Sequence, residues 1–128
     1  MKDLNHDKRP PMATILVLDD DANVRRLLRA VLESYGYEVL DAAEGRAGLT
    51  LYRQRAADLV ITDICMPTLD GLDLMIELMR EFLNVKVIAM SGTRELLGRA
   101  KLLGVRHTFH KPFDMKEMLS AVKYELAH

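Results

Sequence analysis

Cysteine and excess charge of one sign are both scarce in this sequence of 128 residues. Cys65 is the single cysteine, so no disulfide can form within the chain. The 18 Lys and Arg residues nearly balance the 19 Asp and Glu residues. This balance gives no general electrostatic reason to bind nucleic acid or an anionic membrane. A single cysteine fits a reducing compartment, and we expect a cytoplasmic protein.

Long apolar runs are missing as well. Residues 1–12 are polar and contain no apolar stretch of signal-peptide length. No run elsewhere approaches the ~20 apolar residues of a membrane span. The length of the chain fits one compact domain. We therefore expect a soluble protein with a flexible lead at residues 1–12 and one domain over residues 13–128.

The chain does contain a regular alternation of short apolar runs and segments with helical periodicity. Strands are predicted at residues 14–18, 37–40, 59–62, 85–90 and 107–110. Helices are predicted between them, around 24–32 with Gly36 as its end, at 43–55, 72–82 and 93–103, and from a cap at Asp114 to about Leu126. This pattern indicates an α/β fold with a parallel sheet covered on both faces. We predict a doubly wound (βα)5 sandwich of the flavodoxin-like type, with 2-1-3-4-5 as one of the two common strand orders.

Polar residues follow the predicted strands. Asp19 and Asp20 follow the first strand, Asp63 the third, Ser91 the fourth and Lys111 the fifth. The carboxyl ends of parallel strands meet at one edge of a sheet, so we expect these side chains to lie together. Three carboxylates so placed repel one another, and one would stay protonated unless a cation joined them. Lys111 supplies one positive charge, and a hard divalent ion such as Mg²⁺ would supply the rest.

Such a site attracts a phosphoryl group, because a metal ion and an ammonium group both neutralise charge on phosphoryl oxygens. A carboxylate is a competent nucleophile for phosphoryl transfer and forms an acyl phosphate. Ser91 can donate a hydrogen bond to a phosphoryl oxygen, and Gly92 leaves space for that oxygen beside it.

Four segments together resemble the receiver domain of two-component response regulators, the CheY-like family. They are ILVLDDD at 15–21, DLVITDICMPTLDGLDL at 58–74, VIAMSG at 87–92 and HKPF at 110–113. Each segment alone is a weak signal, but together, in order and each at a strand end, they are highly specific. The resemblance extends over residues 13–126.

The resemblance implies a role for each acidic residue at the predicted sheet edge. Asp63 would be the phosphoacceptor, and Asp20 and Asp63 would bind Mg²⁺ directly. Asp19 would act mostly through a metal-bound water. The backbone carbonyl of Cys65, two residues after the acceptor, would be the third protein ligand.

The resemblance also implies the roles of the other two site residues. Lys111 would pair with the acceptor carboxylate and then with the phosphoryl group, and its peptide bond to Pro112 would be cis. Ser91 would take the position of the hydroxyl that switches. Many receivers carry an aromatic residue three positions before this lysine, where the present chain has Thr108. Phe109 should face the opposite side of its strand, so the readout is expected to pass through the backbone and the helix after the fourth strand instead.

The partners implied by the resemblance are those of a signalling switch that only assists its own phosphorylation and dephosphorylation. A phosphohistidine of a sensor kinase or of a histidine phosphotransfer protein would donate the phosphoryl group, and a phosphatase would help to remove it. The surface formed by the fourth helix, the fifth strand and the fifth helix would control a partner or output domain, or form a homodimer. No direct binding to nucleic acid or membrane is expected.

Other interpretations of these residues remain open at this point. A Mg²⁺-dependent phosphohydrolase also uses an aspartyl phosphate, although it typically needs a second acid where this chain has Cys65. A degenerate receiver could act as a constitutive interaction module. Asp21 is expected to cap a helix, and Ser91 could do the same. His107 and His110 are three apart on a strand and make a poor metal pair.

Overall fold

A computed structural model of the chain describes residues 12–65 and 71–128. Strands and helices alternate along it in the order β2 (Thr14–Leu18), α1 (Ala22–Ser34), β3 (Glu38–Ala42), α2 (Gly45–Gln54), β4 (Leu59–Asp63), α3 (Gly71–Glu81), β5 (Val87–Ser91), α4 (Arg94–Leu102), β6 (His107–His110) and α5 (Met115–Ala127). The predicted (βα)5 alternation is therefore confirmed. Residues 1–11, where the flexible lead is predicted, and residues 66–70, between β4 and α3, lie outside the described residues.

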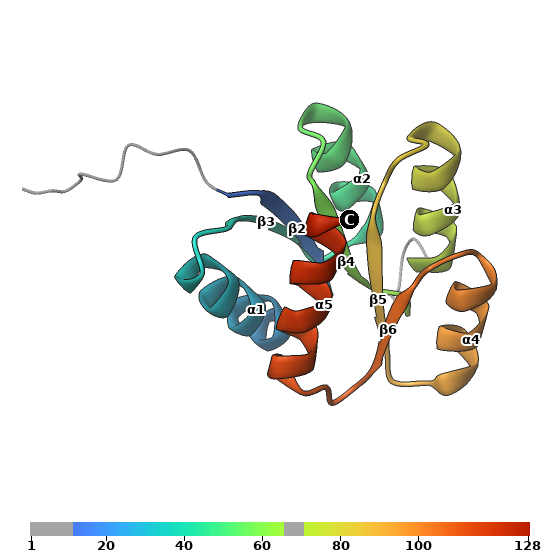
Figure 1. The fold of residues 1–128 in the computed structure, drawn as a ribbon. Coiled ribbons are helices and arrows are strands. Elements are labelled where there is room, and N and C mark those ends of the chain that lie inside the picture. Colours follow the sequence, from blue (N-terminus) through green and yellow to red (C-terminus); the bar gives the residue numbers. More distant parts are fainter. Residues whose placement is uncertain (1–11, 66–70) are drawn as a thin grey trace, which may run out of the picture.

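The five strands form one sheet in the order β3-β2-β4-β5-β6, and all four neighbouring pairs are parallel. Counted along the chain this order is 2-1-3-4-5, as predicted. The first strand lies inside the sheet, and the chain reverses its direction of travel across the sheet after β3 (Figure 1). β2 and β4 flank this switch point, where open α/β sheets bind their ligands.

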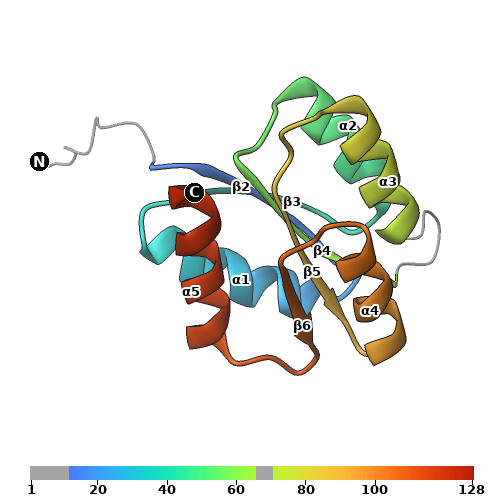
Figure 2. The same ribbon diagram turned by 45° about the vertical axis from the view of Figure 1, so that its right-hand side comes forward.

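Each face of the sheet is covered by its own layer of helices. Alternate residues of β2 divide between the two faces: Leu16 and Leu18 pack in the core that α2, α3 and α4 cover, and Ile15 and Val17 in the core under α1 and α5. Figure 2 shows α1 and α5 on one side of the sheet and α2, α3 and α4 on the other. Burial on both faces explains why the strands are continuous apolar runs rather than alternating ones.

Several strand ends differ by one or two residues from the sequence-based expectation, and two of these differences concern site residues. Asp63 and Ser91 are the last residues of β4 and β5 rather than the first residues after them. Asp63 is in register with Met90, and Ser91 with His110. Both side chains are therefore carried by the ladder of the sheet and not by a loop.

Helix ends follow the predicted capping residues. The side chains of Asp21 and Asp114 accept hydrogen bonds from the backbone N–H groups of Asn23 and Lys116, at 2.8 and 2.7 Å. Each therefore satisfies one unpaired donor at the start of its helix. Gly36 follows α1 with a φ of +94°, a conformation that glycine adopts without steric cost. Within the described residues, no helix is long and apolar enough to cross a membrane.

The core predicts a large difference between two chemically identical substitutions. Leu16 is completely buried in the centre of the sheet, whereas Leu83 is 91% exposed. We expect Leu16→Ala to lower the free energy of unfolding by about 2–5 kcal/mol, because it leaves a cavity, and Leu83→Ala to change it by less than about 0.5 kcal/mol. Denaturant unfolding followed by circular dichroism measures both. Equal effects would contradict the assignment of this core.

Candidate functional site

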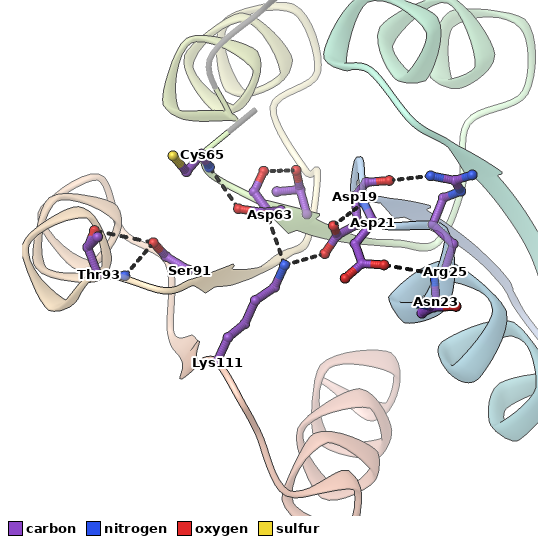
Figure 3. A network of polar contacts seen from close by, with 10 residues as sticks. Asp19, Asp21, Asn23, Arg25, Asp63, Cys65, Ser91, Thr93 and Lys111 are labelled. Carbon is purple, nitrogen blue, oxygen red and sulfur yellow. Dashed lines mark hydrogen bonds and ion pairs between the residues drawn. The ribbon is translucent and has the colours of Figure 1, made fainter. Parts of the chain in front are cut away.

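Four strand ends bring together all of the predicted site residues at one edge of the sheet. Asp19 follows β2, Lys111 follows β6, and Asp63 and Ser91 end β4 and β5. Figure 3 shows Lys111 reaching from its own strand end toward the carboxylates of Asp19 and Asp63. The clustering at the carboxyl edge that the parallel sheet predicts is therefore present in the structure.

Three carboxylates form the centre of the site. The nearest carboxylate oxygens of Asp19, Asp20 and Asp63 all lie within 4.8 Å of one another. Asp19 is completely buried, Asp63 is 5% exposed, and Asp20 is open to solvent. No other cluster of three such acidic, histidine or cysteine ligands occurs in residues 12–65 and 71–128.

Lys111 joins two of these carboxylates. Its Nζ lies 2.6 Å from Asp19 Oδ2 and 2.7 Å from Asp63 Oδ2. Burial by itself lowers the pKa of Lys111, but the hydrogen bonds to the two aspartates outweigh it and the pKa is raised. The ammonium group is therefore held in its charged form. The peptide bond between Lys111 and Pro112 is cis, as the resemblance implies.

The buried carboxylate of Asp19 accepts hydrogen bonds on both of its oxygens. Burial raises its pKa, although the hydrogen bonds from Lys111 and from the backbone N–H of Asp21 act in the opposite direction. The Asp21 N–H donates to Asp19 Oδ1 at 2.9 Å, so both carboxylate oxygens of Asp19 have a partner.

The site as a whole carries more negative than positive charge. One ammonium group lies beside three carboxylates, and the excess negative charge is on carboxylate oxygens. These residues fit Mg²⁺, a hard cation that prefers oxygen ligands and keeps several waters.

The acceptor candidate is fixed by its own loop. The backbone N–H of Cys65 donates to Asp63 Oδ1 at 2.8 Å. The hydroxyl of Thr62 donates to the Asp63 carbonyl at 2.9 Å. The sulfur of Cys65 is exposed and points away from the Asp63 side chain (Figure 3). The main chain of Cys65, rather than its thiol, is therefore the part that contacts the site.

Ser91 contacts the start of α4. Its Oγ accepts a hydrogen bond from the backbone N–H of Thr93 at 3.0 Å and lies 3.3 Å from Thr93 Oγ1. Thr93 is the N-cap residue of α4 but makes no capping bond with its own side chain. Ser91 is thus bonded to the N-cap residue of α4 and does not cap the helix itself. A Cβ placed on Gly92 would meet no atom within 4 Å, so the space beside Ser91 is open.

The aromatic residues near β6 do not replace the aromatic side chain that many receivers carry at the position of Thr108. Phe109 and Phe113 are partly buried and pack against the core under α1 and α5, with ring centroids 6.3 Å apart. Thr108, the neighbouring residue, points to the opposite face by strand alternation and is half-buried. His107 Nδ1 lies 2.8 Å from Glu125 Oε2, so His107 is part of the packing of α5 rather than of a metal site.

One contact at the site is not predicted by the sequence motifs. The guanidinium group of Arg25 on α1 donates to the backbone carbonyl of Asp19 at 2.7 Å. The available signal is that a positive residue stands near the start of a helix, where the helix dipole favours negative ones. Here its partner is the end of β2.

Comparison with known proteins agrees with this geometry. The model of the response regulator receiver domain family matches residues 15–123. The chain is 34% identical over 111 residues to the sporulation initiation phosphotransferase F of Bacillus subtilis, covering 85% of this chain and 90% of that protein. It is 36% identical over 113 residues to the chemotaxis protein CheY of Treponema pallidum, covering 84% of this chain and 78% of that protein.

Solved structures show the same fold. The response regulator protein TrrA from Thermotoga maritima, in complex with Mg²⁺ and BeF, superposes with a TM-score of 0.82 at 31% identity, covering 89% of this chain and 99% of that one. The chain spans about half the length of some curated relatives, such as the probable transcriptional regulator ycf27 of Porphyridium aerugineum, of which it covers 46%. The chain belongs to the response regulator receiver domain family, whose members are switches in phosphorylation-based two-component signalling.

Proposed function

We propose that Asp63 accepts a phosphoryl group from a phosphohistidine of a sensor kinase or of a histidine phosphotransfer protein, within a single cytoplasmic receiver domain over residues 13–128. The observation that carries this proposal is the bridge from Lys111 to both Asp63 and the buried Asp19. It supplies a charged donor within reach of the acceptor carboxylate. The phosphotransferase name of the relative in Bacillus subtilis supports the same chemistry.

The transfer step follows from the position of each group. A carboxylate oxygen of Asp63 attacks the phosphorus, the bond between phosphorus and the histidine nitrogen breaks, and the imidazole leaves with the electron pair. Lys111 Nζ then stabilises charge on a phosphoryl oxygen, since it already lies 2.7 Å from Asp63 Oδ2. The Ser91 hydroxyl donates to another phosphoryl oxygen through the open space beside Gly92.

The acidic residues would hold a magnesium ion in this function. Asp20, Asp63 and the backbone carbonyl of Cys65 would be direct ligands, and Asp19 would act through a metal-bound water. When bound, the ion neutralises charge on the phosphoryl oxygens and relieves the repulsion among the carboxylates. The oxygen-only cluster and the Mg²⁺ and BeF complex of the Thermotoga relative support this assignment.

The phosphohydrolase alternative has less support. Two residues after Asp63 the chain has Cys65, whose sulfur points away from the acceptor, so the second acid of such enzymes is missing (Figure 3). We propose instead that the Asp63 phosphate is lost by slow hydrolysis that the site itself assists, and by a phosphatase. The complex of CheX and CheY from Borrelia burgdorferi offers a model for a partner bound to a receiver.

The output surface in this proposal comprises α4, β6 and α5, where a partner, an output domain or a second copy would bind. The contact from Ser91 to Thr93 joins the proposed phosphate site to the N-cap residue of α4. If Ser91 turns toward the phosphoryl group, that hydrogen bond breaks and the start of α4 must adjust. This path needs no aromatic ring at Thr108. A phosphate-dependent change of α4 is a population shift produced by differential contacts.

The acceptor assignment predicts the result of one substitution. Asp63→Asn should abolish covalent labelling by a phosphorylated kinase, or by a small acyl phosphodonor with Mg²⁺, because the amide cannot form the acyl phosphate. Mass spectrometry of the intact protein measures the label. Asp73→Asn, on the exposed side of α3, is the matched control and should be labelled normally. Undiminished labelling of Asp63→Asn would remove Asp63 as the acceptor.

The charge imbalance at the site predicts a change in stability. In EDTA, Asp20→Asn should raise the free energy of unfolding by about 1 kcal/mol, because it removes a repulsive charge that lies within 4.8 Å of two others. Added Mg²⁺ should stabilise the wild-type protein through binding to the folded state, and the variant much less. Chemical denaturation with and without Mg²⁺ measures both effects. Asp73→Asn should show no gain, and an equal gain there would exclude local repulsion as the cause.

The proposed path to the output surface predicts where the backbone responds. Binding of BeF with Mg²⁺ should change amide hydrogen exchange in residues 93–104, since the hydrogen bond from the Thr93 N–H to Ser91 is lost. Ser91→Ala should reduce that change, because the alanine makes no such bond. Asp63→Asn gives the background level. An unchanged 93–104 segment in the wild-type protein with the mimic bound would contradict this path.

A further inference from the structure

Arg25 connects three elements around the acidic cluster. Its NH1 group donates to the backbone carbonyl of Asp19 at 2.7 Å, and its Nε lies 3.9 Å from Asp41 Oδ2. Arg25 belongs to α1, Asp41 to β3, and Asp19 follows β2. The Arg25 side chain is only 21% exposed. Figure 3 shows it lying directly beside the turn that carries the acidic residues.

The carbonyl that Arg25 holds belongs to the peptide bond between Asp19 and Asp20. Because a peptide unit is planar, the direction of this carbonyl also sets the direction of the Asp20 amide and the position of its Cα. The Asp19 N–H donates to Ala42 at 3.2 Å, and the Asp19 carboxylate is held by Asp21 and Lys111. The contact from Arg25 therefore completes the polar partners of Asp19.

Asp20 contrasts with Asp19. Its carboxylate is exposed and bonds to no residue of the described part of the chain, although it lies within 4.8 Å of the other two carboxylates. Its side chain therefore has no partner of its own to fix it. Its direction depends on the backbone of the turn, and the Arg25 contact fixes the peptide plane immediately before it.

We propose that Arg25 is a positioning residue for the metal site: by holding the Asp19–Asp20 peptide, it aims the Asp20 carboxylate at the ion. The inference rests on the proposed Mg²⁺ site and adds to it a residue outside the ligand set. Groups that orient metal ligands without touching the metal commonly change affinity by about 10–100-fold when they are removed.

The test is the Mg²⁺ affinity of Arg25→Met, measured by calorimetric titration of the folded protein with MgCl2. We expect the dissociation constant to rise by about 10-fold or more. The matched control is Arg26→Met, which removes the same charge one residue later. Arg26 is exposed and its NH2 group donates to Asn23 Oδ1, away from the Asp19 carbonyl. The control should retain the wild-type affinity.

A second readout separates positioning from a general loss of structure. The rate of labelling by a small acyl phosphodonor is measured against Mg²⁺ concentration. For Arg25→Met, the Mg²⁺ concentration that gives half of the maximal rate should rise, while the rate at saturating Mg²⁺ stays close to that of the wild-type protein. A lower maximal rate with an unchanged half-saturating concentration would overturn the proposal.

The outcomes distinguish this inference from the function on which it rests. If the wild-type protein binds no Mg²⁺, the proposed metal site itself fails. If Arg25→Met binds Mg²⁺ as tightly as the wild-type protein, or Arg26→Met loses as much affinity, only the role of Arg25 is refuted. Should Arg25→Met not fold, Asp41→Asn takes its place, since it loosens the guanidinium group without removing it. A weaker Mg²⁺ affinity supports the proposal, and an unchanged one refutes it.

Discussion

The functional edge of this receiver domain depends on one ammonium group placed between two buried carboxylates. Asp19 and Asp63 are almost fully buried, and a charge in that position is costly unless it is paired. Lys111 provides the pair for both, at 2.6 and 2.7 Å. It does not balance the site, because the neighbouring Asp20 adds a further negative charge. The residual negative charge favours a cation, and in the proposed function that cation would offset the charge of the phosphoryl group.

The fold was largely predictable because its strands are buried on both faces. Runs such as residues 14–18 stand out as continuous apolar segments, and glycines and aspartates mark the helix ends. Strand ends were less predictable. Asp63 and Ser91 look like loop residues because they are polar, yet hydrogen bonding to neighbouring strands keeps both in the sheet. The polarity of a side chain does not show whether the backbone of the same residue is hydrogen-bonded to a neighbouring strand.

The site could be located from sequence because the topology of a parallel sheet gathers the residues at its strand ends. The role of Arg25 could not, because it depends on how far α1 lies from the end of β2. An arginine among the polar positions of a helix carries no mark of its eventual partner. The same holds for the bond between Ser91 and Thr93, which requires the geometry of one turn. Sequence motifs identify the candidate site residues themselves. The residues that hold them in position can be identified only from the packing of the folded chain.

The strand order also sets how long each side chain at the site must be. Neighbouring strands are about 4.8 Å apart, so the short side chains of Asp19, Asp63 and Ser91 can meet across adjacent strands. Lys111 follows β6, with β5 between it and Asp63 on β4. Its ammonium group must therefore extend across an intervening strand to reach Asp63, and further still to Asp19. Among the cationic side chains, only a long one can do this, so reach as well as charge excludes histidine at this position.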